Sequence, residues 1–155
     1  MKKGRLIFFC GKMGAGKTTL AKSKAEEMDG VLISEDELLD KLYEGKVGSV
    51  SGYKYYSDKL KPVVVNLSQQ ILSKGINTVL DFPANTVRQR QWLRSISDSI
   101  SANHICYYVE RSDEVCINHL LKRGNPNTDT AEMFNAITQY FTVPSFDESL
   151  NIEKV

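Results

Sequence analysis

The sequence has few cysteines, few prolines and almost no net charge. Its 155 residues include three Cys, four Pro and one Trp, and the formal net charge at pH 7 is +1. The cysteines, Cys10, Cys106 and Cys116, are odd in number and match neither a disulfide framework nor a zinc site, so we interpret them as small buried hydrophobic residues. The balanced charge gives no indication of a nucleic acid or a membrane surface as a partner.

Long hydrophobic runs are also missing. The apolar run from Leu6 to Cys10 is too short for the core of a signal peptide, and it leads directly into glycines and a lysine. No apolar stretch approaches the roughly 20 residues that a membrane-spanning helix needs. We therefore expect a cytoplasmic protein with no membrane contact, and we see no indication of an obligate protein partner. The length suits one domain over residues 1–155.

Short apolar segments alternate with segments of helical periodicity. Strands are predicted at 6–10, 31–33, 76–80 and 104–109, and helices at 17–28, 35–43, 58–73, from 86, from 112 and at 130–141. Strands alternating with helices predict an α/β fold, a three-layer sandwich around a mostly parallel sheet. Ligands of such sheets bind beyond the carboxyl ends of the strands.

The connecting segments carry further predictions. Ser34 and Ser112 are expected to cap the helices that follow them, and residues 45–57 are predicted to form a long surface loop. Residues 124–127 are predicted as another loop. After Phe146 the chain leaves little room for a final strand and a loop that grips an adenine ring.

A glycine-rich loop follows the first predicted strand. Residues 11–18 fit the pattern G-x-x-x-x-G-K-[ST] without a mismatch. Backbone N–H groups of such a loop converge on phosphate oxygens, and the following helix adds its positive N-terminus. Lys17 would hold the β- and γ-phosphates, and the Thr18 hydroxyl would bind Mg²⁺. The predicted nucleotide-binding residues are Gly11, Lys12, Met13, Gly14, Ala15, Gly16, Lys17, Thr18 and Thr19, and the predicted cofactors are ATP and Mg²⁺.

Two carboxylates follow predicted strands. Asp36 comes after the second strand, where a carboxylate could take the proton of an acceptor hydroxyl, or could merely stabilise the dipole of a helix. Asp81 ends the third strand, where it would support Mg²⁺ together with Thr18, or simply form a turn. We favour the functional interpretation of both.

Arginines are the remaining candidates for phosphate contacts. Arg88, Arg90 and Arg123 fall where phosphate could be near. Arg123 ends a helix before Gly124 and could neutralise transition-state charge from a lid, or face the dipole of its own helix. Arg88 stands at the start of a helix, where its charge opposes the dipole, and this favours a specific anionic partner.

Several segments resemble one family of phosphate-loop kinases, which includes phage-type polynucleotide 5′-kinase and many bacterial relatives. The matching segments are residues 6–19, Ile33–Leu38, Asp81–Arg88 with Trp92, Tyr53–Tyr55 with Lys59 and Lys61, and Leu121–Gly124. The resemblance implies a parallel sheet, transfer of the γ-phosphoryl group, Asp36 as the general base and Arg123 as the lid arginine. It also suggests that Tyr53, Lys54 and Arg88 contact the substrate.

One residue departs from that family. Its nucleic-acid kinases carry an arginine three residues after the base, and this chain has Leu39 there. We therefore expect a kinase that phosphorylates a hydroxyl of a small molecule. A 5′-hydroxyl kinase of nucleic acid is the alternative, supported by the tyrosines and lysines at 53–61, which could stack on bases and meet phosphates. A nucleotide-binding switch without a transfer substrate is an alternative of another class. The acceptor, the preference for ATP over GTP and the oligomeric state stay open.

Overall fold

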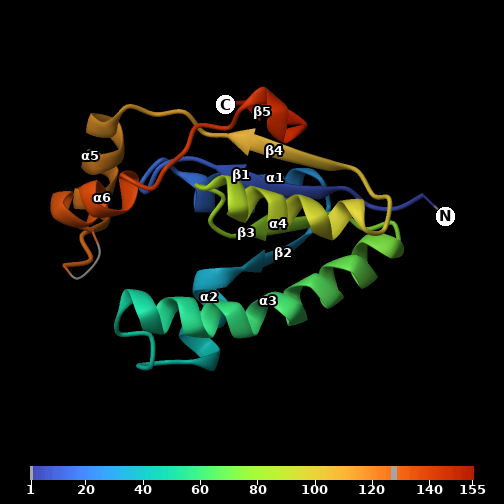
Figure 1. The fold of residues 1–155 in the computed structure, drawn as a ribbon, viewed down its shortest axis with the longest axis horizontal. Helices are drawn as coiled ribbons and strands as arrows, with labels where there is room; N and C mark the ends of the chain where they lie inside the picture. Colours follow the sequence, from blue (N-terminus) through green and yellow to red (C-terminus); the bar gives the residue numbers. More distant parts are fainter. Residues whose placement is uncertain (1, 127–128) are drawn as a thin grey trace.

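Helices cover both faces of a parallel sheet in the computed structural model, which describes residues 2–126 and 129–155 (Figure 1). Within these residues the sheet has five strands in the order β2-β3-β1-β4-β5, and every neighbouring pair is parallel. The strands are β1 (Leu6–Cys10), β2 (Val31–Ser34), β3 (Thr78–Asp81), β4 (His104–Tyr108) and β5 (Ile152–Lys154). The predicted fold class is confirmed.

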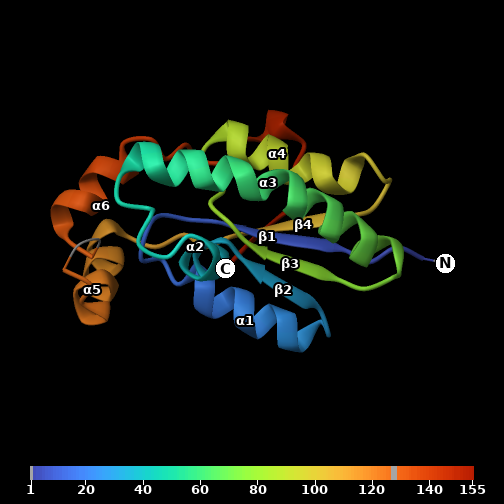
Figure 2. The ribbon, with the colours of Figure 1, turned by 90° about the horizontal axis from the view of Figure 1, so that it is seen from below.

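The helices form two layers and a cluster at one end. Helix α1 lies on one face of the sheet, and α3 and α4 lie on the other (Figure 2). Helices α5 and α6 lie beyond the carboxyl ends of β1 and β4, far from the N-terminus. The bounds are α1 (Lys17–Glu27), α2 (Glu35–Leu42), α3 (Val50–Ser73), α4 (Val87–Asp98), α5 (Asp113–Arg123), α6 (Ala131–Thr138) and the 3₁₀ helix η1 (Phe146–Glu148). None of the helices in the described segments combines the length and apolar character that crossing a membrane would require.

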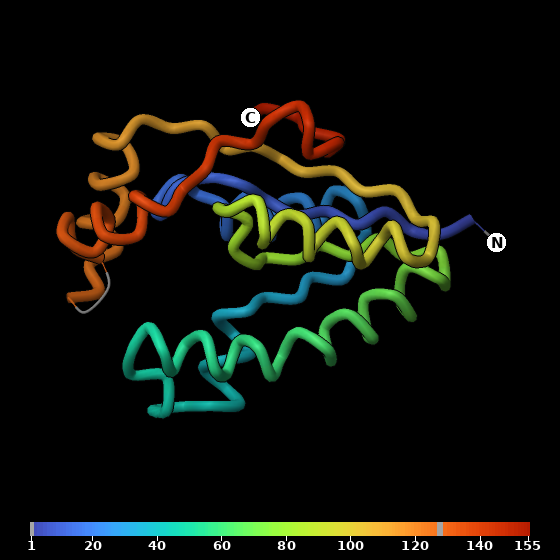
Figure 3. The backbone as a smooth tube through the Cα atoms, viewed as in Figure 1, coloured from blue at the N-terminus to red at the C-terminus, as the bar shows by residue number. Residues whose placement is uncertain are grey.

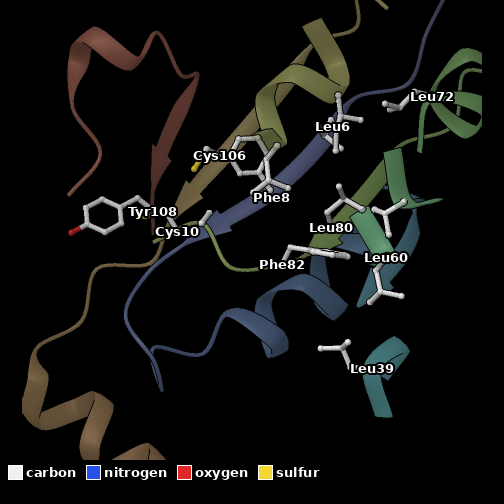
Figure 4. Close-up of a cluster of buried hydrophobic side chains, with 14 residues drawn as sticks. Leu6, Phe8, Cys10, Leu39, Leu60, Leu72, Leu80, Phe82, Cys106 and Tyr108 are labelled. Atoms are coloured by element: carbon white, nitrogen blue, oxygen red, sulfur yellow. The ribbon is translucent and has the colours of Figure 1, made fainter. Parts of the chain in front are cut away.

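Strand β1 is the centre of the core. Its residues are buried on both faces because successive side chains of a strand point to opposite sides and helices cover both. Leu6, Phe8 and Cys10 pack toward α3 and α4 (Figure 4), whereas Ile7 and Phe9 pack against α1. Burying each large apolar side chain stabilises the fold by about 1.5–3 kcal/mol. The phosphate loop therefore starts from a strand that is buried along its whole length.

The three cysteines are free and buried, as the sequence predicts. Cys10 and Cys106 belong to the same hydrophobic cluster on the α3 side of the sheet. Burial raises the pKa of the Cys10 thiol, and it raises the pKa of Cys106 to about 12. These thiols therefore stay neutral and act as hydrophobic side chains.

The prediction of a loop at 45–57 is partly wrong, because α3 begins at Val50. Ser49 caps the helix by accepting a hydrogen bond from the Gly52 amide at 3.0 Å. The ring of Tyr56 packs on Tyr43 at the end of α2, with 4.4 Å between ring centroids. The cap and the packing of Tyr56 on α2 together outweigh the low helix propensity of the glycine and the tyrosines. The expected side-chain cap of α2 is also wrong, because Ser34 makes no capping hydrogen bond, whereas Ser112 caps α5 as predicted.

The residues after Phe146 do form a final strand, contrary to the sequence interpretation. Strand β5 pairs with β4 in the register Cys106 to Ile152, and Figure 3 traces the chain from α6 back alongside β4. A strand of three residues can form here because it adds to the edge of β4, which supplies parallel backbone hydrogen bonds on one side of β5.

A buried ion pair anchors the segment that precedes β5. Arg90 of α4 is fully buried, and its guanidinium binds both carboxylate oxygens of Glu148 at 2.8 and 3.1 Å. The same guanidinium donates to the carbonyl oxygen of Ala84 at 2.9 Å. Arg90 is therefore a structural residue, and its predicted place near phosphate is wrong. The interaction ties η1 to the loop that follows β3.

Candidate functional site

The glycine-rich loop turns sharply from β1 into α1. Gly14 and Gly16 adopt the left-handed conformation, with φ of 80° and 96°. A side chain at Gly14 would also lie only 2.5 Å from the carbonyl oxygen of Cys116, so only glycine fits there. Gly16 immediately precedes the N-terminus of α1. The backbone thus has the sharp turn and the free helix N-terminus that an anion-binding loop needs.

Lys17 begins α1 and folds back over the loop. Its ammonium donates a hydrogen bond to the carbonyl oxygen of Gly11. Burial lowers the pKa of Lys17, and the negative charges of Asp81 and Asp36 partly oppose this shift. A bound anion would oppose it further, because a nearby negative charge favours the protonated amine. The Lys17 amine is thus held against the loop, where a bound phosphate would favour its protonated form.

Thr18 and Asp81 meet although 63 positions separate them in the chain. The Thr18 hydroxyl donates to Asp81 Oδ2 at 2.9 Å, because α1 begins at the edge of the sheet where β3 ends. Burial raises the pKa of Asp81, and the negative charge of Asp36 adds to that increase. A hydroxyl beside a carboxylate offers the oxygen ligands that Mg²⁺ prefers, with waters and phosphate oxygens supplying the others. Within the described residues, no three acidic, histidine or cysteine side chains gather into a metal site of their own.

Asp36 lies in a groove that also reaches Thr18 and Asp81. The groove has a volume of about 660 Å³ and runs between α1 and α2. Its ionisable lining residues are five carboxylates and two lysines, namely Asp36, Glu37, Asp40, Glu44, Asp81, Lys22 and Lys41. Lys41 is already paired with Glu37 at 3.0 Å. The groove is therefore acidic overall.

Leu39, at the position where the resembled nucleic-acid kinases have arginine, does not reach this groove. Its side chain is 6% exposed and packs in the hydrophobic core. A leucine suits this position, because a charged side chain at this depth would need a partner.

The predicted substrate residues Tyr53 and Lys54 lie in the first turns of α3. Tyr53 is half-buried, and its hydroxyl donates to the carboxylate of Glu35. Lys54 is exposed and pairs with Asp58 at 2.8 Å. Arg88 is exposed in the first turn of α4. The structure thus gathers Lys17, Thr18, Asp36 and Asp81, while Tyr53 already has a buried partner.

Arg123 ends α5, as predicted, and pairs with the start of the next segment. Its guanidinium donates to both carboxylate oxygens of Asp129, at 2.8 and 2.7 Å. The Asp129 side chain is fully buried, whereas 60% of the Arg123 side chain is exposed. This hydrogen bonding raises the pKa of Arg123, and the charge of Asp36 adds to the increase. Asn127 of the predicted loop 124–127 lies outside the described residues.

Helix α5 braces the phosphate loop, which the sequence did not indicate. Lys12 pairs with Asp113 at 2.6 Å, and His119 Nδ1 lies 2.9 Å from the Gly14 carbonyl oxygen. Neither contact has a sequence signature, because both partners lie about a hundred positions away. The loop is therefore held between β1, α1 and α5.

Comparisons with known proteins agree with this fold. The sequence matches the model of the AAA domain family over residues 6–144. A protein of Chloroflexus aurantiacus to which a kinase activity is provisionally ascribed superposes with a TM-score of 0.77 at 17% identity, covering 100% of this chain and 86% of that one. A sugar kinase from Janibacter gives 0.68 at 16% identity, covering 97% and 85%. The APS kinase of Mycobacterium tuberculosis, solved with AMPPNP and APS, gives 0.67 at 14% identity, covering 100% and 89%. At these identities the solved structures show a common fold.

Proposed function

The chain belongs to the AAA domain family, and from its phosphate loop, Asp36 and Asp81 we propose that it is a kinase that transfers the γ-phosphoryl group of MgATP to a hydroxyl of a small molecule. The fold that it shares with a sugar kinase and an APS kinase supports this reaction class. Fold alone does not choose an acceptor, so the acceptor is argued from the site.

The proposal rests on the position of Asp36. It lines the same groove as Thr18 and Asp81, so a carboxylate faces the place where the magnesium ligands gather. A switch protein would need Lys17 and Thr18 but no base beside them. A carboxylate within reach of an acceptor hydroxyl is the group that phosphoryl transfer uses to orient the hydroxyl and accept its proton.

Each residue has a defined task in this reaction. Loop amides and Lys17 bind the phosphates, and Thr18 and Asp81 would hold Mg²⁺, which neutralises phosphate charge when bound. The acceptor oxygen forms a bond to the γ-phosphorus while the bond from that phosphorus to the bridging oxygen breaks. The acceptor proton passes to Asp36, and ADP leaves. Arg123, near enough for the charge of Asp36 to influence its pKa, is proposed to neutralise transition-state charge.

The charge of the groove supports a small acceptor over the alternative of a polynucleotide. Five carboxylates and two lysines line it, and a strand of phosphates would be repelled there. Two of the tyrosines proposed to stack on bases already make contacts within the protein. The Tyr53 hydroxyl donates a hydrogen bond to Glu35, and the Tyr56 ring packs on Tyr43. Tyr55 is the exposed one of the three, and Lys59 lies over its ring at 5.0 Å.

A transfer assay with γ-labelled ATP tests the acceptor class directly. Sugars, nucleosides, amino alcohols of the aminoglycoside type and oligonucleotides with a 5′-hydroxyl would be offered separately. We expect label on a small hydroxyl compound and none on the oligonucleotides. Label on the oligonucleotides, with binding that weakens steeply as salt is added, would instead support the nucleic-acid alternative.

Replacing Lys17 tests nucleotide binding without any acceptor. Lys17→Ala removes a cation from the phosphate site, so we expect MgATP affinity to fall at least about tenfold, or roughly 1.4 kcal/mol. Thr18→Ala should weaken mainly the magnesium-dependent part. Titration calorimetry measures both affinities.

Lys24→Ala is the matched control, because Lys24 is on the same helix and pairs with Glu27. Equal MgATP binding by wild type and Lys17→Ala would refute the assignment of the phosphate loop.

A further inference from the structure

Glu35, the residue before the proposed base, is a buried carboxylate. It is the first residue of α2, and its exposed fraction is 2%. Both of its oxygens accept hydrogen bonds from α3, one from the Tyr53 hydroxyl and the other from the Ser57 hydroxyl at 2.8 Å. The two donors are four residues apart, so they lie on the same face of the helix. Glu35 thus connects the start of α2 to the first turns of α3.

Burying the Glu35 carboxylate costs free energy unless both of its oxygens accept hydrogen bonds. Burial raises the pKa of Glu35, and its two hydrogen bonds oppose that shift, as does the positive charge of Lys61, whereas the negative charge of Asp36 adds to it. A buried carboxylate that loses a donor is left unsatisfied, which costs about 1–3 kcal/mol or more. Only one placement of α2 against α3 satisfies both oxygens, whereas an apolar side chain would tolerate several. A fully satisfied polar group therefore selects a single arrangement of the two helices.

The start of α2 has no side-chain cap that could hold it in place of this contact. Ser34 occupies the capping position and makes no side-chain capping hydrogen bond. The other end of α2 is held by the packing of the Tyr43 ring against the Tyr56 ring. Helix α2 is therefore attached to α3 near both ends, and the attachment at its N-terminus is the carboxylate of Glu35.

Asp36 and Glu35 are consecutive residues of the same helical turn. Asp36 is exposed in the groove, whereas Glu35 points into the contact with α3. Any rotation or slide of α2 that breaks the Glu35 hydrogen bonds also moves Asp36 relative to Thr18 and Asp81. A shift of about 1 Å in a catalytic group can cost about 10²-fold in rate.

We propose that Glu35, Tyr53 and Ser57 form a buried joint between α2 and α3 that positions Asp36 for phosphoryl transfer. In this role Tyr53 is a positioning residue, not the substrate contact that the sequence predicts. The proposal rests on the proposed function, in which Asp36 is the base.

The joint itself is tested by hydrogen exchange, which needs no acceptor. Tyr53→Phe keeps the ring and removes the donor. We expect amide exchange in residues 35–42 to accelerate by about tenfold, with the amides of β1 and β4 unchanged, because the opening is local. Tyr55→Phe is the control, since Tyr55 is on the same helix and exposed, and it should change neither region. Unchanged exchange at 35–42 in Tyr53→Phe would overturn the joint.

The positioning role is tested by hydrolysis of MgATP, with water as the acceptor, in Asp36→Asn, Tyr53→Phe and the double variant. We expect Tyr53→Phe to lower kcat about tenfold with an unchanged KM for MgATP, and the double variant to match Asp36→Asn. A further drop in the double variant would overturn the positioning role, because Tyr53 would then act independently of Asp36. If Asp36→Asn hydrolysed MgATP at the wild-type rate, Asp36 would not be the base of the proposed function, and the positioning role would be overturned with it. The hydrogen-exchange experiment tests the joint independently of that outcome.

Discussion

Asp36→Asn is expected to slow phosphoryl transfer by about 10²–10⁴-fold, the usual contribution of a general base. The substitution keeps the shape of the side chain and removes its charge and its basic oxygen. Affinity for MgATP should stay nearly constant, because the phosphate loop, Lys17 and Thr18 hold the nucleotide. Stability should change by at most about 1 kcal/mol, since an exposed acid in the first turn of a helix contributes no more than that through the dipole.

The matched control for this experiment is Glu114→Gln. Glu114 is likewise an exposed acid in the first turn of a helix, α5, but it does not line the groove that contains Asp36. It should transfer phosphate at close to the wild-type rate once an acceptor is identified. Equal turnover by wild type and Asp36→Asn would show that Asp36 only begins a helix. Asp81, which lines the same groove, would then be the next candidate for the base.

Glu148→Ala is expected to destabilise the protein by about 3–5 kcal/mol, because it leaves the Arg90 guanidinium buried without its partner. The side chains of Arg90 and Glu148 are 0% and 6% exposed, so water cannot replace the lost contact without opening the core. The loss is a large part of the roughly 5–15 kcal/mol that folded proteins typically have. Urea denaturation monitored by tryptophan fluorescence would show a lower midpoint.

Two further variants make this prediction specific. Asp147→Ala, one residue earlier and exposed, should leave the midpoint nearly unchanged. The double replacement Arg90→Met with Glu148→Leu should recover much of the loss, because apolar residues of similar volume often replace a buried ion pair without penalty. If Glu148→Ala unfolded at the wild-type midpoint, the ion pair would have no structural role.

The elements that the sequence predicted correctly are those with a local signal. Strand β1 is a continuous apolar run, and every one of its residues is buried in the centre of the sheet. The phosphate loop needs glycine where φ is positive, and this requirement leaves its mark directly in the sequence at Gly14 and Gly16. Asp81 could be placed near Thr18 because the carboxyl ends of parallel strands meet at one edge of the sheet.

The errors occur where local signals are weak. Residues 50–57 contain a glycine and three tyrosines and read as a loop, yet they form the first turns of α3 because Ser57, Tyr53 and Tyr56 find partners on α2 and beside it. Strand β5 is three residues long and exists because β4 offers it a free edge. Neither element has enough periodicity of its own to be recognised.

The sequence by itself determined the fold class, the phosphate loop and the placement of Thr18 and Asp81 at the same end of the sheet, because these follow from short-range patterns and from the geometry of a parallel sheet. Only the tertiary structure decided which charges pair. Arg90 forms an ion pair with Glu148, 58 residues away in the sequence. Glu35 of α2 accepts a hydrogen bond from Tyr53 of α3, and Arg123 pairs with Asp129. A buried charged side chain requires a partner. The relative positions of the packed elements decide which residue becomes that partner, and the packing of the whole core sets those positions. The acidic groove likewise arises only when α2 lies beside α1.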